Sequence, residues 1–277
     1  MALAYVNGRL IEEADAELSV FDHGLVVGDG VFETVLVQRG RPFALEAHLD
    51  RLARSAAGLG IGPVSRRELH GAAAAVVEAA RLAEARLRIT VTAGRGPLGS
   101  SRLGGPPSII VALEPLGEPH EHAAVHVVAW TRNERGALAG LKTTSYAENA
   151  LALARAASKG ADEAIFANTA ARLCEGTGSN VFVVLDGELC TPPLSSGCLA
   201  GITRALVLAH HGGTERDVPI EAFRAEAVKE AFLTSSLRGV QPISAIDGVA
   251  LAWPGPVTKQ AAATYAALLE APAHSPF

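Results

Sequence analysis

The spacing of apolar residues changes repeatedly along this 277-residue chain, and these changes restrict its fold more than any other sequence feature. Residues 30–45, GVFETVLVQRGRPFAL, alternate apolar and polar side chains around Arg39-Gly40, which predicts two paired β-strands joined by a turn. The next stretch, EAHLDRLARSAAGLG, keeps apolar residues at helical spacing and ends at Gly60. A chain that combines both spacings is expected to fold into sheets covered by helices.

Similar elements are predicted on both sides of a short linker. Asn7-Gly8 provides the positive φ angles of a type I′ turn, which predicts an opening hairpin. We expect a second helix over residues 65–84, and then two strands, RLRITVTAG and SIIVALEPL, separated by a loop rich in Gly, Ser and Pro. The segment EPLGEPHEH contains two prolines, a glycine and charged residues, and we place the linker at residues 118–124. The prediction is an α+β protein with α/β domains at residues 1–117 and 125–277.

Composition excludes several classes of function. The net charge is −5 and the basic residues form no stripe, which argues against a nucleic-acid partner. The start, MALAYVNGRL, lacks the features of a signal peptide, and no segment approaches the roughly 18 apolar residues of a membrane span. Three cysteines, Cys174, Cys190 and Cys198, form no C-x-x-C pair, as expected of reduced thiols. We therefore expect a soluble, cytoplasmic protein without a membrane partner.

Lys142 occupies an unusual position in the segment LKTTSYAENALALA. It ends an apolar stretch and precedes a predicted helix, for which Ser145 and Glu148 have the S-x-x-E spacing of a capping box. The partial positive charge of a helix N-terminus disfavours a second positive charge, so an amine there should lose its proton readily. That property suits a nucleophile or Schiff-base former. The alternative is a solvated lysine at the edge of an element.

A carboxylate and two groups of hydrogen-bond donors could act with this amine. Glu175 lies between an apolar strand and a glycine-rich loop, where we expect a cationic partner; a surface acid is the alternative. Gly201-Ile202-Thr203 begins an apolar helix, whose free N–H groups could bind an anion, although every helix has such an end. Thr234-Ser235-Ser236 ends an apolar strand and offers three hydroxyls for a phosphate or for a plain turn.

More familiar signatures are missing. The sequence contains no G-x-G-x-x-G between a strand and a helix, no P-loop and no G-x-S-x-G. The histidines at positions 120, 122, 210 and 211 lack the carboxylates of a metal site, so we expect no metal. The set that remains fits pyridoxal phosphate, which needs a lysine for its aldehyde, an acid for its ring nitrogen and N–H or O–H donors for its phosphate.

In order and spacing, these segments resemble the class IV, fold-type IV pyridoxal-phosphate enzymes, which include branched-chain and D-amino-acid transaminases and 4-amino-4-deoxychorismate lyase. The resemblance extends from FDHGLVVGDGVFET through EAHLDRL, LKTTSYAENALALA, GADEAIFAN, CEGTGSNVF and TPPLSSGCLAGITR to FLTSS. It implies a D-amino-acid-aminotransferase-like fold with a small N-terminal α/β domain, a larger C-terminal domain that binds pyridoxal phosphate, and a homodimer.

Matched position by position, the resemblance assigns roles to particular residues. It implies that Lys142 is the Schiff-base lysine and also moves the proton of the substrate Cα, that Glu175 pairs with the pyridine nitrogen, and that Arg51 binds the phosphate. Tyr146 corresponds to the tyrosine that hydrogen-bonds the phenolic oxygen, and Phe32 to an aromatic wall of the substrate pocket. The other cofactor-binding positions that it implies are Ser179, Asn180, Ile202, Thr203, Ser235 and Ser236.

The subfamily is less clearly indicated. The Arg-x-His carboxylate trap of D-amino-acid transaminases is absent from the loop GRGPLGSSRL, where Arg95 and Arg102 are our candidates for binding the substrate carboxylate. Tyr146 favours a transaminase that moves an amino group between an amino acid or amine and a 2-oxo acid. GDGVFET and TAGRGPLG also resemble bacterial aminodeoxychorismate lyases, which release pyruvate and 4-aminobenzoate. A catalytically silent binding protein is disfavoured by the presence of Lys142, Glu175 and Arg51.

Overall fold

The structure is a computed structural model that describes residues 3–224 and 228–271. The chain divides into two compact units: the first runs to Glu118 and includes Leu141–Tyr146, and the second comprises Pro119–Gly140 and the chain from Ala147 onward. This boundary falls inside the predicted linker. The predicted domains placed Lys142 in the C-terminal part, whereas residues 141–146 group with the first unit because their backbone pairs with its strand β3 (Gly30–Gln38).

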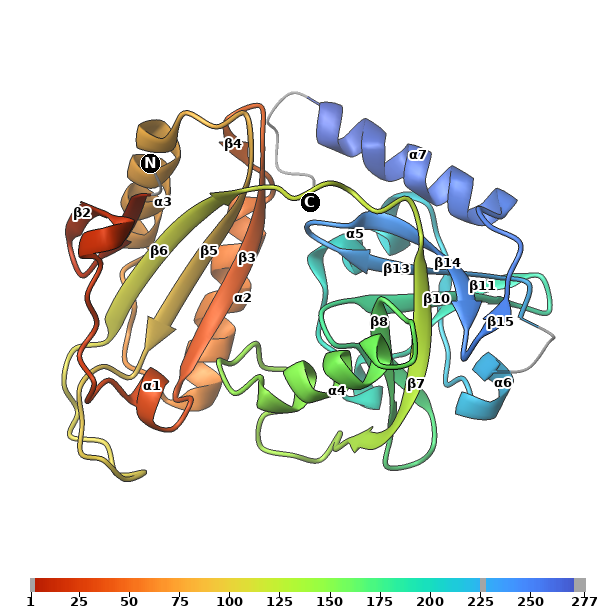
Figure 1. The fold of residues 1–277 in the computed structure, drawn as a ribbon, viewed down its shortest axis with the longest axis horizontal. Coiled ribbons are helices and arrows are strands. Elements are labelled where there is room, and N and C mark those ends of the chain that lie inside the picture. Colours follow the sequence, from red (N-terminus) through yellow and green to blue (C-terminus); the bar gives the residue numbers. More distant parts are fainter. Residues whose placement is uncertain (1–2, 225–227, 272–277) are drawn as a thin grey trace. The chain divides into compact units, whose positions relative to one another are not determined.

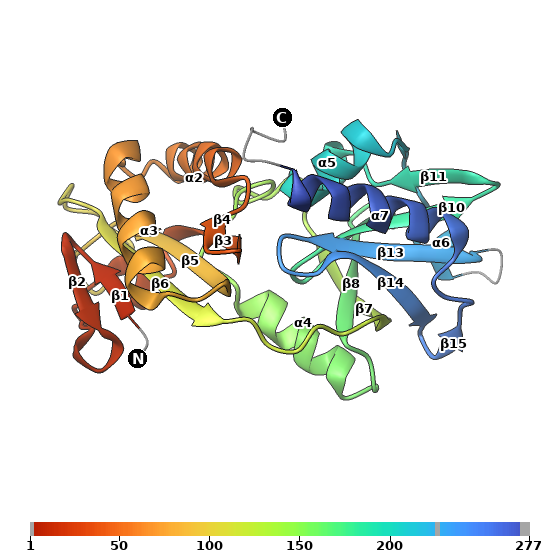
Figure 2. The same cartoon turned by 90° about the horizontal axis from the view of Figure 1, so that it is seen from above.

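The first unit is a six-stranded antiparallel sheet in the order β2-β1-β6-β5-β3-β4. Its other strands are β1 Leu3–Val6, β2 Arg9–Glu12, β4 Arg41–Pro42, β5 Glu84–Thr92 and β6 Ser108–Pro115. Its helices are η1 Glu13–Asp15, α1 His23–Val26, α2 Leu45–Leu59 and α3 Arg66–Ala80. Figure 2 shows α2 and α3 on one face of this sheet. Helix α3 is shorter than the predicted 65–84 because Arg81 is left-handed, with φ +52°, and Glu84 begins β5.

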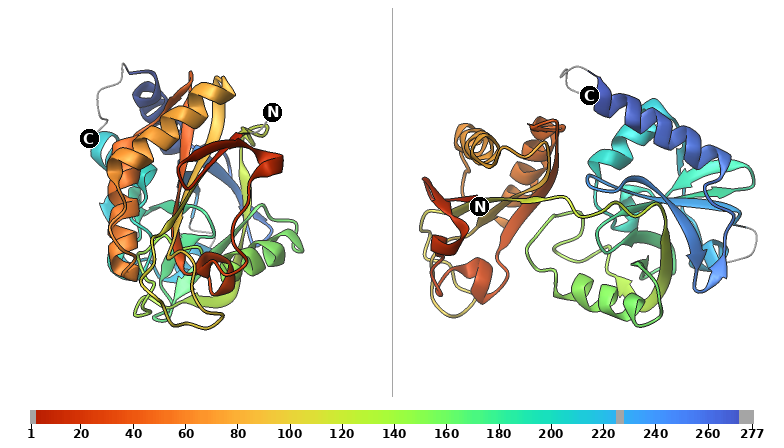
Figure 3. Two further views of the ribbon diagram at one scale, coloured as in Figure 1. Left: turned by 90° about the vertical axis from the view of Figure 1, so that its left-hand side faces the viewer. Right: turned by 45° about the horizontal axis from the view of Figure 1, so that its top comes forward.

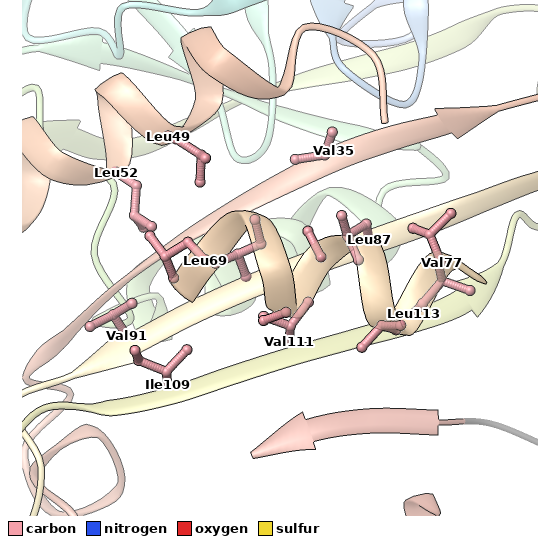
Figure 4. Packing of buried hydrophobic residues seen from close by; sticks show 14 of the residues in the cluster. Val35, Leu49, Leu52, Leu69, Val77, Leu87, Val91, Ile109, Val111 and Leu113 are labelled. Atoms are coloured by element: carbon pink, nitrogen blue, oxygen red, sulfur yellow. The ribbon is translucent and has the colours of Figure 1, made fainter. Parts of the chain in front are cut away.

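Local sequence explains the hairpins of the first unit, and burial explains how it packs. Asn7 and Gly8 have φ of +47° and +91°, and Arg39 and Gly40 have +52° and +70°, which confirms both predicted turns. Leucines and valines of β3, β5 and β6 meet those of α2 and α3 in a continuous core (Figure 4). Leu52 is 1% exposed, and burial of such a side chain contributes roughly 1.5–3 kcal/mol.

The second unit contains a nine-stranded mixed sheet, in which β12-β11-β10-β13-β14-β7-β8-β9 are neighbours and β15 pairs with β14. Pairs β14–β7, β7–β8 and β11–β12 are parallel. The strands are β7 Ala123–Arg132, β8 Glu163–Asn168, β9 Leu173–Gly176, β10 Asn180–Leu185, β11 Glu188–Thr191, β12 Thr214–Glu215, β13 Glu230–Ser235, β14 Gly239–Ile246 and β15 Val249–Ala250. The helices are α4 Ala147–Ala157, η2 Leu194–Ser196, α5 Ile202–His210, α6 Ile220–Arg224 and α7 Pro256–Glu270.

Helices pack against the second sheet at separate places along its strands. Helix α4 packs on β7 and β8, whereas α5 and α7 pack on β13 and each other; the green and blue helices of the second unit in Figures 1 and 3 follow this arrangement. An antiparallel sheet in one unit and a mixed sheet in the other, each with helices packed against it, confirm the predicted α+β class. In the described part of the chain, none of the helices has the length and apolar character that crossing a bilayer requires.

Candidate active site

The backbone of Lys142 is held within the first unit by hydrogen bonds of both its carbonyl and its N–H group. Its carbonyl accepts the N–H of Phe32 at 3.0 Å, and its own N–H donates to Oγ of the buried Ser55 at 3.1 Å. Two residues further on, the Thr144 N–H donates to the Gly30 carbonyl at 2.8 Å. Residues 142–144 thus lie along the start of β3, which holds the lysine backbone in one position.

A glycine makes this close approach possible. Gly28 has φ +70°, and a Cβ atom there would lie 2.8 Å from Oγ of Ser145. The Ser145 hydroxyl donates to the Gly28 carbonyl at 3.0 Å, and the carboxylate of Glu148 pairs with Arg132 at 2.8 Å. The predicted capping box between Ser145 and Glu148 was therefore wrong, because both side chains bind other groups and α4 begins only at Ala147.

The Lys142 side chain lies among aromatic rings. Its Nζ is 3.4 Å from the Tyr146 hydroxyl and 4.2 Å from the centre of the Phe32 ring. Phe32 and Tyr146 meet edge to face, with ring centres 5.0 Å apart. The structure therefore brings together three residues that the sequence nominated for one site, around an amine that is only half exposed.

Arg88 joins this cluster, and the sequence analysis missed it. It lies on β5, and its guanidinium stacks on the Phe32 ring, with Cζ 3.4 Å from the ring centre. The side chain meets solvent, yet desolvation by its neighbours lowers the pKa of the guanidinium. No carboxylate in the described part of the chain forms a salt bridge with Arg88. A cation without an anionic partner beside Lys142 is suited to bind an anion from outside the protein.

Arg51 forms a buried ion pair with Glu33. Its Nε and Nη2 donate to the two carboxylate oxygens of Glu33 at 2.8 and 2.7 Å, and Nδ1 of His48 lies 2.7 Å from the same carboxylate. Burial alone would raise the pKa of Glu33, but the charge and hydrogen bonds of Arg51, with those of His48, outweigh it and lower that pKa to about 2. Burial, only partly offset by Glu33, lowers the pKa of His48. The phosphate role of Arg51 stays a prediction.

The two arginines nominated for the substrate carboxylate lie in different surroundings. Arg102 forms a two-pronged ion pair with Asp29, and its Nη1 donates to the Leu59 carbonyl at 2.7 Å. Its guanidinium is thus already engaged in anchoring the 95–107 loop to the end of α2. Arg95 is exposed and makes no salt bridge within residues 3–224 and 228–271.

Glu175 lies on β9 of the second unit and has the cationic partner that its position indicated. Its Oε1 is 3.3 Å from Nε of Arg132, and its Oε2 accepts the Leu199 N–H at 2.9 Å. Arg132 is held in turn by Glu148 at 2.8 Å and by the face of Phe166, 4.1 Å from the guanidinium carbon. These contacts fix the orientation of the carboxylate.

The helix start predicted at Gly201-Ile202-Thr203 is present in the same unit, and its binding of an anion stays a prediction. Ile202 and Thr203 open α5, and Gly201 is its N-cap. A Cβ atom at Gly201 would lie 1.9 Å from Oδ1 of Asn180, so only glycine fits there. The Asn180 amide donates to the Leu199 carbonyl at 2.9 Å, in the loop that also binds Glu175. Glu175, Asn180 and the N-terminus of α5 are therefore held together.

The three hydroxyl side chains of Thr234, Ser235 and Ser236 lie at the end of β13, which pairs with the strand of Asn180. Asn180 on β10 is paired with Thr234, so Ser235 and Ser236 follow at the same edge of the sheet. The Thr234 hydroxyl is buried and has no hydrogen-bond partner among the described residues. Ser179 is buried in the loop just before Asn180. The second unit thus gathers a carboxylate, a helix N-terminus and several hydroxyls. The carboxylate can accept a hydrogen bond from a protonated ring nitrogen, and the N–H and O–H groups can donate to a phosphate.

Two other site types find no support in the described residues. No group of three or more His, Cys, Asp or Glu side chains there could hold a metal ion. The three cysteines are free and buried, and burial raises the pKa of Cys198 to about 11 and that of Cys174 further, which disfavours a reactive thiolate.

Comparison with known proteins identifies the family. Residues 30–246 match the model of amino-transferase class IV. A Methanocaldococcus jannaschii protein, provisionally named a branched-chain-amino-acid aminotransferase, is 36% identical over 88% of both chains. The D-alanine aminotransferase of Bacillus licheniformis is 30% identical over 91% of this chain and 92% of its own, and the aminodeoxychorismate lyase of Bacillus subtilis is 30% identical over 89% and 87%.

Solved structures agree with this result. The branched-chain aminotransferase of Thermoproteus uzoniensis, solved with norvaline, superposes with a TM-score of 0.87 at 30% identity and covers 96% of this chain and 94% of its own. A hypothetical aminotransferase from Mycobacterium tuberculosis, in a form with bound pyridoxal phosphate, gives 0.85 at 26% identity, over 97% and 99%. The chain belongs to the class IV aminotransferases, the fold-type IV enzymes that depend on pyridoxal phosphate.

Proposed function

We propose that this enzyme is a pyridoxal-phosphate-dependent transaminase that moves an amino group between an amino acid or amine and a 2-oxo acid. The observation that carries the proposal is Lys142, whose backbone is fixed to β3 and whose amine lies 3.4 Å from the Tyr146 hydroxyl. An amine that serves both as the covalent anchor and as the proton carrier must be held in place in this way.

The residues present fit the cofactor. Lys142 offers the amine and Tyr146 a hydroxyl beside it. Glu175 offers a carboxylate that Arg132 holds in place, and the start of α5 with Ser235 and Ser236 offers N–H and O–H donors. Bound pyridoxal phosphate would supply an aldehyde that takes up the amino group and a ring that withdraws electrons from the substrate Cα.

Each of these residues then has a defined task. Lys142 Nζ accepts the proton from the substrate Cα and returns it. Tyr146 orients that amine through its hydroxyl. With the cofactor bound, Glu175 would keep a proton on its ring nitrogen. Its phosphate would be held by Arg51, Ile202, Thr203, Ser235 and Ser236, and Ser179 with Asn180 would contact its ring. Phe32 forms an apolar wall beside the amine, which keeps water away from it.

Arg88 is our candidate for binding the substrate carboxylate, in preference to Arg95 and Arg102. We expect Arg88→Met to raise the KM for an amino-acid donor about 10- to 100-fold, as the loss of a charged hydrogen bond implies, with a smaller change in kcat. The KM for (R)-1-phenylethylamine, which has no carboxylate, should not change. Arg86→Met is the matched control, because Arg86 lies on the same strand and pairs with Glu114. Equal effects of both variants on the amino-acid KM would discard this assignment.

The central test follows the cofactor through one half-reaction. The purified protein should carry the visible absorption of bound pyridoxal phosphate, and D-alanine, L-leucine and (R)-1-phenylethylamine are added in separate cuvettes. Stoichiometric conversion to the pyridoxamine form by one of them is the expected result, and it names the substrate class. Absence of the visible band from protein incubated with pyridoxal phosphate would refute the cofactor proposal itself.

A second candidate is 4-amino-4-deoxychorismate lyase, because the Bacillus subtilis lyase is 30% identical over most of both chains. The same lysine and carboxylate would then serve pyruvate elimination. Release of pyruvate from aminodeoxychorismate without any 2-oxo acid acceptor would favour the lyase, and no conversion by any of the three amino donors would agree with it.

We also propose a soluble homodimer in the cytoplasm, without nucleic-acid or membrane partners. The free, buried cysteines support the cytoplasmic location, and the net charge of −5 argues against a nucleic-acid partner. Sedimentation or light scattering of the purified chain measures the dimer directly.

A further inference from the structure

Glu163 is a fully buried carboxylate for which the proposed reaction has no use. It begins β8 and is 0% exposed. A buried charge is costly unless it is paired and hydrogen-bonded, and an apolar side chain could fill the same space at lower cost. The carboxylate must therefore serve the groups that surround it.

Besides the Ala164 N–H of its own strand, which donates to Oε1 at 3.0 Å, those groups come from two separate segments of the second unit. From the 176–179 loop, Thr177 donates its N–H to Oε1 at 3.0 Å and its hydroxyl to the same oxygen, and the Ser179 hydroxyl donates to Oε2 at 3.2 Å. From the 235–238 turn, Nη2 of Arg238 lies 3.3 Å from Oε2. Glu163 is thus shared between two segments that are about 60 residues apart in the chain.

Both segments adjoin proposed cofactor-binding residues. The 176–179 loop follows Glu175 and contains Ser179, and a Cβ at Gly176 would lie 2.3 Å from the Ser179 hydroxyl, so the loop is tightly closed. In the 235–238 turn, the Arg238 N–H donates to Oγ of Ser235 at 3.2 Å, and Nη1 of Arg238 donates to the Gln241 side chain at 3.1 Å. A single carboxylate therefore holds both the loop that contains Ser179 and the turn that follows Ser235.

We propose that Glu163, acting through Thr177, Ser179 and Arg238, is a positioning residue that sets the two loops for cofactor binding. This inference rests on the proposed function, because that function assigns pyridoxal phosphate as the ligand of the two loops. If the inference is right, replacing Glu163 lowers the affinity for pyridoxal phosphate by more than the accompanying loss of stability explains. A purely structural buried acid would lower stability alone.

The test compares Glu163→Gln with Glu230→Gln. Glu230 is also a buried carboxylate of this unit, but it binds the Thr258 N–H at the start of α7, at the opposite end of β13 from Ser235. Each full-length protein is titrated with pyridoxal phosphate by visible absorbance and, separately, melted without added cofactor. We expect Glu163→Gln to weaken pyridoxal phosphate binding about 10- to 100-fold, the usual value of a charged hydrogen bond, and Glu230→Gln to change it less than about threefold.

A second comparison uses pyridoxal, which lacks the phosphate. If the 235–238 turn is set by Glu163, the preference of the protein for pyridoxal phosphate over pyridoxal should fall in Glu163→Gln and in Arg238→Met, and Arg238→Lys should restore part of it. Wild-type affinity and preference in a folded Glu163→Gln protein would overturn the inference. Should that variant not fold, unchanged preference in both Arg238→Met and Thr177→Val would overturn it.

These outcomes separate the inference from the function on which it rests. A wild-type protein that binds no pyridoxal phosphate contradicts the proposed function. A wild-type protein that binds it, with variants that bind it equally well, contradicts only the role of Glu163. Equal losses of affinity in Glu163→Gln and Glu230→Gln would also contradict that role, because general loosening of the unit would then explain them.

Discussion

Replacing Lys142 with alanine should lower turnover by about ten-thousand-fold or more, since loss of a group that is both covalent anchor and proton carrier typically costs that much. The fold should survive, because the bonds that hold this segment use the backbone of Lys142 and not its side chain. Turnover of a donor and acceptor pair by the purified variant, beside its melting temperature, measures both effects.

The matched control for this variant is Lys159→Ala, which removes an exposed lysine just after α4. It should keep wild-type turnover. Borohydride treatment of the wild-type holoenzyme, followed by peptide mass spectrometry, should locate the cofactor on the peptide that contains Lys142. Full turnover by Lys142→Ala would refute both the transaminase and the lyase.

Glu33→Gln should lower the free energy of unfolding by about 3–5 kcal/mol, the usual cost of breaking a buried ion pair, because it removes the carboxylate with which the buried Arg51 guanidinium pairs. The contribution of Glu33 to the free energy of unfolding depends on pH. The folded-state pKa of Glu33 is about 2 against an ordinary 4.5, so its contribution is fully present above pH 4.5 and is lost as the pH falls towards 2. The stability difference between wild type and variant should therefore shrink in acid.

Chemical unfolding between pH 7 and pH 3 measures this difference. Glu46→Gln is the control, because Glu46 forms an exposed pair with Arg66 and its loss should leave stability nearly unchanged. A Glu33→Gln protein as stable as the wild type at pH 7 would show that the buried pair makes no net contribution.

The sequence predicted those features that depend on the conformational preferences of one or two neighbouring residues. Turns at Asn7-Gly8 and Arg39-Gly40 need positive φ, and the start of α5 at Gly201 needs a residue without Cβ, so these features were visible in single residues. Lys142 was predicted because its position ahead of a helix was unusual. Helix α7 was missed, because no feature that we used marked it.

Features that depend on distant partners were not predicted. Arg88 looked like one more polar residue of an alternating strand, and only the fold stacks it on Phe32. Glu33 and Glu163 did carry a signal, since each lies in a strand of mostly apolar residues, and a carboxylate buried there needs a partner. The partners themselves, Arg51 and Arg238, are 18 and 75 positions away, and sequence spacing does not reveal them.

The short return of residues 141–146 to the first unit has a consequence for the order of synthesis. A ribosome that has released only residues 1–118 has made six strands but not the segment that accepts the Phe32 N–H and donates to the Gly30 carbonyl. The first unit becomes complete only after about thirty more residues have emerged, and those residues already include the opening strand of the second. Synthesis of the second unit therefore begins before the first unit is complete. A protein cut at the linker would lack the 141–146 segment of its N-terminal unit.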